Sequence, residues 1–147
     1  MYIKDVLNAK GYDVSTIGHE QTIAEATKML IRNKIGSLIV KDDTGEIVGI
    51  FSERDALREC HLNEGNCGEV KIKDVMTTNL IFAEPEDDVN YVLGIITTNR
   101  IRHVPVMNEK KLVGIVSIGD LVKKLLNEQQ FENKYLRDYI QGTTPKG

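Results

Sequence analysis

Two serine–aspartate pairs with the same spacing are the residues of this sequence best suited to chemistry. Ser52 precedes Asp55 by three positions, as Ser117 precedes Asp120, and each pair follows a glycine and two apolar residues. An ionised aspartate offers two acceptor oxygens, which suit the adjacent hydroxyl donors of a ribose. If a helix begins at each serine, its free amides and the positive end of its dipole attract an anion such as phosphate. The pattern predicts a ligand with a sugar and a phosphate.

The same spacing is also typical of a helix capping box. In that motif the serine and the acid bond to backbone amides of the first helical turn, and no ligand is needed. The two interpretations are compatible, because a serine can cap the helix while the aspartate faces a pocket. Both stay open at the level of sequence.

Other residues with chemical potential form smaller groups. Cys60 and Cys67 are the only cysteines, and their spacing is not Cys-x-x-Cys. With His61 they are too few to complete a zinc site, so we expect free thiols and no metal. The sequence has no recognisable Ser-His-Asp arrangement and no paired carboxylates in an apolar setting. We therefore expect the chain not to be an enzyme.

Composition and charge narrow the class further. The 147 residues include 22 acidic and 19 basic side chains, for a formal net charge of −3, which argues against a nucleic-acid partner. Apolar runs stay well short of the roughly 20 residues that span a bilayer. The first residues carry an early acid and no long apolar core, unlike a secretion signal. These features predict a cytoplasmic protein without a membrane partner.

The serine–aspartate pairs lie within a duplicated chain. Residues 3–7 recur at 72–76, residues 34–40 at 100–106 and residues 49–55 at 114–120, at offsets of 69, 66 and 65. Several ordered matches with a nearly constant offset indicate two repeats.

Each repeat has the hydrophobic pattern of strand, helix, strand, strand, helix. Ile23, Ala26, Met29 and Leu30 follow helical spacing, as do Val89, Val92, Leu93 and Ile96. The expected strands are 13–17, 37–40 and 47–51 in the first repeat and 80–83, 103–106 and 112–116 in the second. Further helices are expected to begin at Ser52 and Ser117.

A unit of about 55 residues has little core of its own, so we expect the two repeats to pack together. The predicted fold is α/β (α+β), with two β-α-β-β-α repeats related by a pseudo-twofold axis, packed sheet to sheet, plus a C-terminal helix. The expected boundaries are an N-terminal helix or arm at 1–9, repeats at 10–62 and 72–127, a linker at 63–71, and a C-terminal helix and frayed tail at 128–147.

The repeated Gly-apolar-apolar-Ser-x-x-Asp motif resembles the hallmark of the cystathionine-β-synthase (CBS) domain family. Arg102-His103-Val104-Pro105-Val106 strengthens the resemblance, which covers about residues 10 to 127. Residues 52–55, 101–103 and 139–142 are similar to a stand-alone subgroup from bacteria and plant organelles. The resemblance implies a homodimer that binds AMP, ADP, ATP, S-adenosylmethionine or NAD.

The resemblance also implies two pockets, each with residues from both repeats. The residues expected in one are Ile17, His19, Thr22, Ala24, Gly36, Ser37, Ser117, Gly119 and Asp120. The residues expected in the other are Phe82, Glu84, Ile101, Arg102, Ser52, Arg54 and Asp55. The side chains expected to meet phosphate oxygens are Arg54, Arg102 and His103. Structural alternatives stay open: His19 as a loop residue, His103 as a half-buried strand residue, and Arg102 in a salt bridge to Glu53 or Glu109.

The two pockets are not expected to be equivalent. Gly119 has no side chain where the first repeat has Arg54. The acidic residues between Glu84 and Asp88 disfavour a triphosphate, although they are also typical of a solvated surface. We therefore expect AMP, or a dinucleotide such as NAD, rather than ATP.

These observations predict a regulatory module, for example in energy sensing. Ligand occupancy would be transmitted to a dimer surface or to a regulated partner protein. The alternatives are a structural dimerisation module with degenerate pockets and, more remotely, a nucleotide-processing enzyme.

Overall fold

The computed structural model describes residues 1–140, which divide into two compact units. Unit 1 contains Met1–Tyr12 and the chain from Ala83 onward, and unit 2 contains Asp13–Phe82. The frayed tail expected after residue 140 lies outside the described residues.

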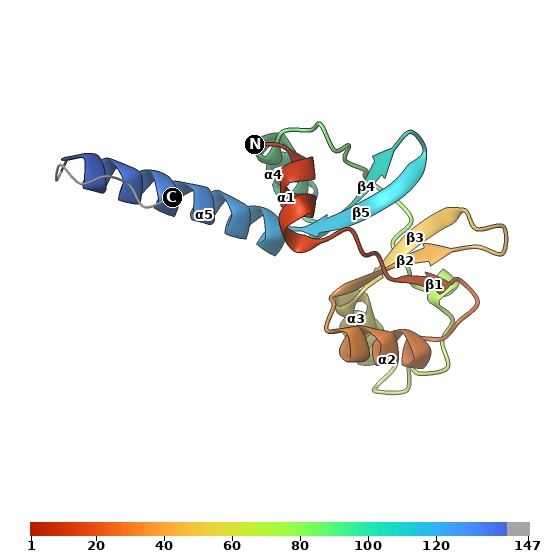
Figure 1. Cartoon of the computed structure of the whole chain (residues 1–147). Helices are drawn as coiled ribbons and strands as arrows, with labels where there is room; N and C mark the ends of the chain where they lie inside the picture. The colour runs from red at the N-terminus through yellow and green to blue at the C-terminus, as the bar shows by residue number, and fades with distance from the viewer. Residues whose placement is uncertain (141–147) are drawn as a thin grey trace. The chain divides into compact units, whose positions relative to one another are not determined.

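Unit 2 is a small sheet with two helices (Figure 1). Its elements are β1 (Thr16–Gly18), α2 (Ile23–Asn33), β2 (Ser37–Lys41), β3 (Ile47–Ser52), α3 (Glu53–Leu62) and the 3₁₀ turn η1 (Ile72–Asp74). The strand order is β1-β2-β3, with β1 parallel to β2 and β2 antiparallel to β3. The core of unit 2 contains Ile23, Ala26 and Leu30, which form the apolar stripe of α2, together with Leu38 and Phe51 of the sheet.

Unit 1 repeats this plan around a two-stranded sheet. Its elements are α1 (Ile3–Lys10), α4 (Val89–Asn99), β4 (His103–Asn108), β5 (Lys111–Ser117) and the long α5 (Ile118–Ile140). Strands β4 and β5 are antiparallel. Val89, Val92 and Ile96 of α4 are buried in a core that also contains Leu121.

The predicted fold class is confirmed: each repeat forms a small sheet with helices, and the predicted hairpins and helical stripes are present. The strand expected at 80–83 is wrong. Only Ala83 pairs, in a single parallel bridge to Val106. The chain turns directly afterwards, since the Asp87 amide donates to the Glu84 carbonyl and the Asp87 carboxylate accepts the Glu84 amide. In addition, α5 continues through residue 140 without a break at 128.

Each repeat begins with a short segment, residues 3–7 or 72–76, which we call its leading segment. Each leading segment packs in the unit that contains the sheet and helices of the other repeat. Residues 72–76 lie with the first repeat, and their equivalents at 3–7 lie with the second. The hydrogen bonds are duplicated too: the Ile23 amide donates to the Val70 carbonyl at 2.9 Å, as Val89 donates to Met1 at 2.9 Å. Each unit is therefore completed by the leading segment of the other repeat.

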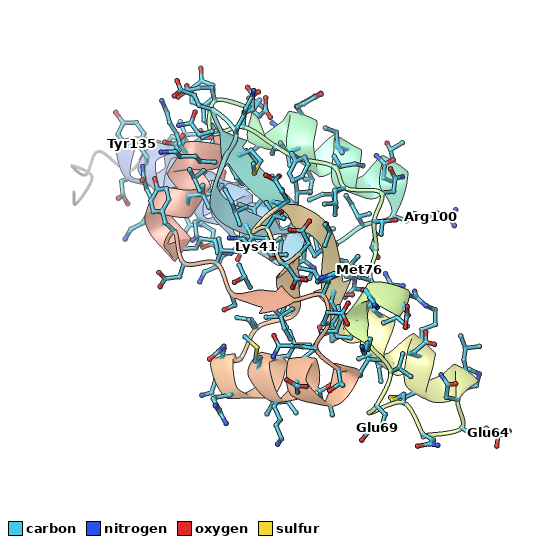
Figure 2. All side chains as sticks on the ribbon, turned by 90° about the vertical axis from the view of Figure 1, so that its right-hand side faces the viewer. Lys41, Glu64, Glu69, Met76, Arg100 and Tyr135 are labelled. Atoms are coloured by element: carbon cyan, nitrogen blue, oxygen red, sulfur yellow. A yellow bond between two sulfur atoms is a disulfide. The ribbon has the colours of Figure 1, made fainter. Side chains whose placement is uncertain are left out.

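The motif glycines make this packing possible. A Cβ on Gly114 would lie 2.7 Å from Leu7 Cδ2, and a Cβ on Gly49 would lie 2.5 Å from Met76 Sδ and 3.0 Å from the Thr77 carbonyl. Leu7 and Met76 are equivalent residues of the two leading segments, and Met76 is labelled in Figure 2. Glycine is thus favoured because a distant segment approaches closely, through the Leu7 side chain at Gly114 and through the Met76 side chain and the Thr77 carbonyl at Gly49, without any need for positive φ.

The free-thiol expectation is wrong. Cys60 and Cys67 form a disulfide across a loop that contains Glu64 (Figure 2). The loop turns back at the end of α3, where the Gly65 amide donates to the Cys60 carbonyl at 2.7 Å. This turn brings the two sulfur atoms together, which the sequence separation of 7 did not reveal.

Enlarging the motif glycines should destabilise the protein. Gly49→Ala and Gly114→Ala are each expected to lower the free energy of unfolding by about 1–3 kcal/mol, because the added methyl group overpacks the contact with the leading segment. Gly94→Ala is the control: this helical glycine is exposed and has open space around it. It should raise stability by about 0.5–1 kcal/mol. Urea unfolding measures all three, and a neutral Gly114→Ala would contradict the packing account.

Breaking the disulfide should also lower stability. The Cys60→Ser/Cys67→Ser variant is expected to lose about 2 kcal/mol, because the short cross-linked loop no longer restricts the unfolded chain. Reduction with dithiothreitol should destabilise the wild type to the same extent and leave the double-serine variant unchanged. Two titratable thiols in the untreated, folded protein would contradict the assignment.

Candidate ligand-binding site

The first strand-to-helix junction is a closed capping box. The Ser52 amide donates to Asp55 Oδ2 at 2.9 Å, and the Asp55 amide donates to Ser52 Oγ at 3.4 Å. The other carboxylate oxygen, Oδ1, accepts from Arg58 at 2.7 Å. The Asp55 side chain is only 6% exposed, so both of its oxygens are engaged within unit 2.

The second junction has the same box but a more open carboxylate. The Ser117 amide donates to Asp120 Oδ2 at 2.9 Å, and the Asp120 amide donates to Ser117 Oγ at 3.0 Å. Lys10 Nζ donates to the same Oδ2 at 2.7 Å. The Asp120 side chain is 26% exposed, so its carboxylate can still meet a ligand.

The electrostatics favour an ionised Asp120. Partial burial raises the pKa of its carboxyl group, but the hydrogen bonds from Lys10 and from the Ser117 amide outweigh that effect and hold the pKa below its usual value. At neutral pH the side chain is therefore an acceptor, as contact with ribose hydroxyls requires.

The capping interpretation is thus confirmed at both junctions. It does not remove the ligand interpretation, because the box uses only one oxygen of each carboxylate. The junctions differ in the other contacts of that carboxylate: Arg58 covers the second oxygen of Asp55, whereas Lys10 shares the oxygen of Asp120 already used by the box.

Each hairpin brings further predicted residues to its own junction. Ser37 pairs with Ser52 in the β2–β3 register, and the Glu53 amide donates to the Gly36 carbonyl at 3.1 Å. In unit 1 the Ile118 amide donates to the Arg102 carbonyl at 2.9 Å, and His103 pairs with Ser117. Some residues that the resemblance assigns to different pockets, such as Ser37 and Ser52, therefore lie beside each other at one strand end. The expectation that each pocket combines residues of both repeats stays a prediction.

The turn between β1 and α2 holds three predicted residues. Thr22 is the N-cap of α2 and accepts the Glu25 amide at 3.3 Å, and Ala24 lies in the first helical turn. The Nε2 atom of His19 is buried and has no hydrogen-bond partner among residues 1–140. The nearest acid is Asp43, whose Oδ1 lies 3.7 Å away.

The neighbouring Glu20 fastens this turn to the segment that leads the second repeat. Its carboxylate accepts from Lys71 and from Lys73, each at 2.8 Å. The hydrogen bonds from Lys71 and Lys73 lower the pKa of Glu20 to about 2. The turn is thereby held in place by charge as well as by backbone bonding.

The remaining predicted residues are spread over both units. Ile17 is buried in β1, and Ile101 and Gly119 flank the β4–β5 hairpin, with Ile101 half-buried and Gly119 exposed. Arg54, Arg102, Phe82 and Glu84 are exposed.

Two residues in the site were missed from the sequence. Arg58 lies one helical turn beyond Asp55, a spacing that permits an ion pair and could have been noticed. Lys10 gave no such signal, because it lies 110 positions before Asp120 and the second repeat has Asn79 at the equivalent position.

Residues 1–140 offer neither a metal cluster nor a membrane-spanning helix. The described chain holds no group of three or more histidine, cysteine, aspartate or glutamate side chains that could bind a metal ion. None of its described helices combines the length and apolarity required to cross a membrane.

Comparison with known proteins agrees with this arrangement. The model of the CBS domain matches residues 3–62 and 72–127. The chain is 34% identical to the mitochondrial CBS domain-containing protein CBSX3 of Arabidopsis thaliana, over 95% of this chain and 72% of that protein. It is 30% identical to the CBS domain-containing protein YhcV of Bacillus subtilis, over 86% of this chain and 87% of the relative.

Solved structures show the same likeness. The CBS-domain protein ATU1752 of Agrobacterium tumefaciens is 37% identical, with a TM-score of 0.79 over 83% of this chain and 91% of its own. The CBS domain pair of protein MJ0100, crystallised with 5′-methylthioadenosine and S-adenosyl-L-methionine, is 28% identical, with a TM-score of 0.73 over 88% of this chain and 98% of its own.

Two matched repeats, together covering most of the chain, and relatives aligned over most of their own length lead to one conclusion. This chain belongs to the CBS domain family, as a tandem pair of CBS domains.

Proposed function

We propose that this chain is a regulatory module that binds an adenosine-containing ligand at its strand-to-helix junctions. The proposal assigns the ribose hydroxyls to the aspartate of a junction and the phosphate to the helix N-terminus and nearby basic side chains. AMP is the favoured ligand, with NAD or ATP as further candidates. No catalytic step is assigned to the chain.

The observation that carries the proposal is the state of Asp120. Its carboxylate lies at the N-terminus of a long helix, is partly exposed and has one oxygen outside the capping box. Adjacent hydroxyls that donate to such an oxygen gain charge-assisted hydrogen bonds. The complex of the related MJ0100 pair with two adenosine compounds supports this ligand class.

The buried Nε2 of His19 supports the proposal independently. A buried polar atom without a hydrogen-bond partner is costly, and a ligand atom is one way to satisfy it. An adenine edge presents both donors and acceptors and suits either tautomer of the histidine. We therefore retain His19 as a proposed adenine contact.

Regulation requires that occupancy changes a surface that something else recognises. Ligand binding favours the conformations that bind it better, so the populations of those conformations shift. The regulated partner and a cytoplasmic location are parts of the proposal that come from the sequence alone. One relative is named as mitochondrial.

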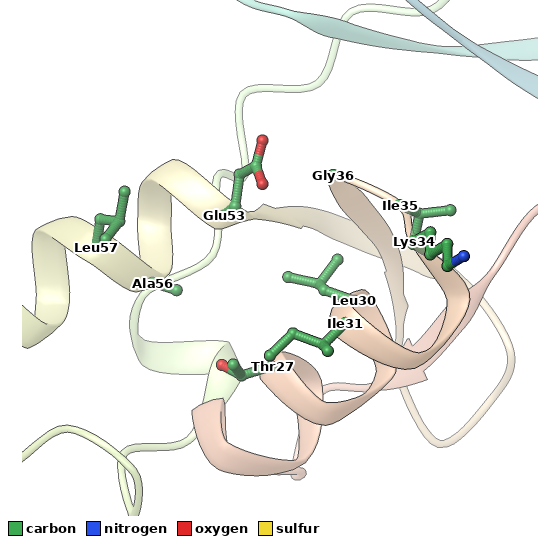
Figure 3. Close-up of a pocket in the computed structure, with 9 residues that line it drawn as sticks. All are labelled: Thr27, Leu30, Ile31, Lys34, Ile35, Gly36, Glu53, Ala56 and Leu57. Atoms are coloured by element: carbon green, nitrogen blue, oxygen red, sulfur yellow. The ribbon is translucent and has the colours of Figure 1, made fainter.

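The expected homodimer also belongs to the proposal. In unit 2 a groove lies between α2 and α3, with Leu30 and Ile31 on one side and Ala56 and Leu57 on the other (Figure 3). Ile31 is 74% exposed and Leu57 is 72% exposed. Exposed apolar side chains that gather on one face are typical of interaction sites. A second copy is the occupant we assign to this face, since a twofold axis brings the same patch of both copies together and would bury Ile31 and Leu57 of each.

Substitution of the two aspartates tests the ligand site. By calorimetry, Asp120→Ala is expected to weaken AMP binding by at least about tenfold, the effect of losing hydrogen bonds to a charged acceptor. Glu69→Ala, at an exposed acid (Figure 2), is the control and should bind as the wild type does. Absence of binding of AMP, NAD, ATP and S-adenosylmethionine to the wild type would overturn the proposed function.

Asp55→Ala should behave differently. Because Asp55 is buried and bonded on both oxygens, its loss is expected to lower the free energy of unfolding by about 1–2 kcal/mol, more than Asp120→Ala does. Thermal melting of both variants measures this order. A larger loss of stability in Asp120→Ala than in Asp55→Ala would contradict the view that the more buried carboxylate contributes more to the fold.

The dimer is tested by charge insertion on the apolar face. Ile31→Glu/Leu57→Glu should convert a dimer into a folded monomer, measured by light scattering and by far-ultraviolet circular dichroism. Lys28→Glu, an exposed position on the same helix α2, is the control and should stay dimeric. A wild type that is monomeric, or a double variant that remains dimeric, would remove this part of the proposal.

A further inference from the structure

The second junction receives a cation from outside its own helix and hairpin. Lys10, the last residue of α1, places Nζ 2.7 Å from Asp120 Oδ2 and 2.8 Å from the Ile115 carbonyl oxygen. The side chain is 30% exposed, so the ammonium group is held between the junction and solvent.

The first junction has no lysine equivalent to Lys10 and uses other groups for the same contacts. Asp55 is paired by Arg58 from its own helix, with Arg54 beside it. The equivalent of Arg54 in the second repeat is Gly119, which has no side chain. At the Ile50 carbonyl, the equivalent of Ile115, the first repeat uses the backbone amide of Thr77 as donor, at 2.9 Å. At the second junction Lys10 thus donates to the carbonyl that a backbone amide contacts at the first junction, and it also places a positive charge beside the Asp120 carboxylate.

The packing of α1 fixes the backbone position of Lys10, and the hydrogen bonds to Asp120 and Ile115 hold its ammonium group. Leu7, one turn earlier, is fully buried and lies against Gly114 of β5. The Ile3 amide donates to the Asp87 carbonyl at 2.9 Å and ties the start of the helix to the same unit. Lys10 is therefore presented by a rigid element, which reduces the entropic cost of using it in binding.

An ammonium group has three donors, and Asp120 and Ile115 account for two of them. The charge of Lys10 also offsets that of Asp120, which would otherwise repel a phosphate close to it. These features suit a ligand with hydroxyl donors for Asp120 and an anionic oxygen for the lysine.

We propose that Lys10 is a ligand-contacting residue that makes the second junction select phosphorylated adenosine compounds over adenosine itself. This inference rests on the proposed function and names the residue that sets its specificity. Lys10 keeps its bond to Asp120 and directs its remaining donor to a phosphate oxygen of the bound nucleotide. The arginine missing at position 119 is thereby replaced from the first helix of the chain.

The test is calorimetry with AMP and adenosine on three variants, all in an Asp55→Asn background so that the second junction dominates the signal. Lys10→Met should weaken AMP binding by about tenfold, as expected for the loss of one hydrogen bond to a charged group, and leave adenosine binding unchanged or tighter. Lys10→Arg should retain the preference for AMP. Lys4→Met is the matched control, because Lys4 is a second ion-paired lysine of α1, bound to Glu86 at 3.1 Å.

The outcomes separate this inference from the proposed function. Equal weakening of AMP and adenosine binding by Lys10→Met, or no weakening of either, would show that Lys10 only positions Asp120 or α1, and would overturn the inference alone. If neither the wild type nor the background variant binds any adenosine compound, the proposed function fails and the inference fails with it. Thermal melting of Lys10→Met against Lys4→Met identifies a loss that comes from unfolding.

Discussion

The reciprocal bond between serine and aspartate at each strand-to-helix junction is the interaction on which the rest of the structure depends. It lets β3 pass directly into α3, and β5 into α5, since the first free amides of each helix are satisfied at the turn. It also fixes a carboxylate at the positive end of the helix dipole. One local motif therefore serves the fold and, in the proposed function, also supplies the group that binds the ribose.

The exchange of leading segments adds a second constraint. Each hairpin carries a glycine because Leu7 or Met76 from the other repeat's leading segment lies against it. A segment that crosses in this way places residues remote in sequence at a junction, and Lys10 at Asp120 is the result. The duplication consequently produces two junctions that share the capping box but differ in the charged side chains around the carboxylate.

The sequence predicted the repeats, the hairpins and the capping boxes because these depend on local periodicity and on spacing within a few residues. It did not predict the Cys60–Cys67 disulfide, which depends on how a loop turns after α3. It also predicted a strand at 80–83, where only Ala83 pairs. Lys10 was missed for the same reason: its contact spans most of the chain. The sequence indicated both serine–aspartate pairs as site candidates, but their unequal exposure follows from tertiary packing.

The most direct test of the central claim is a nuclear magnetic resonance titration of the ¹⁵N-labelled protein with AMP. We expect the amide signals of Gly119 and Asp120, at the start of α5, to shift progressively and to saturate. The side-chain signal of His19 should shift as well if adenine satisfies its buried nitrogen. Saturable shifts confined to residues remote from both junctions, or an unchanged spectrum at millimolar AMP, would contradict the claim that these junctions form an adenosine-binding site.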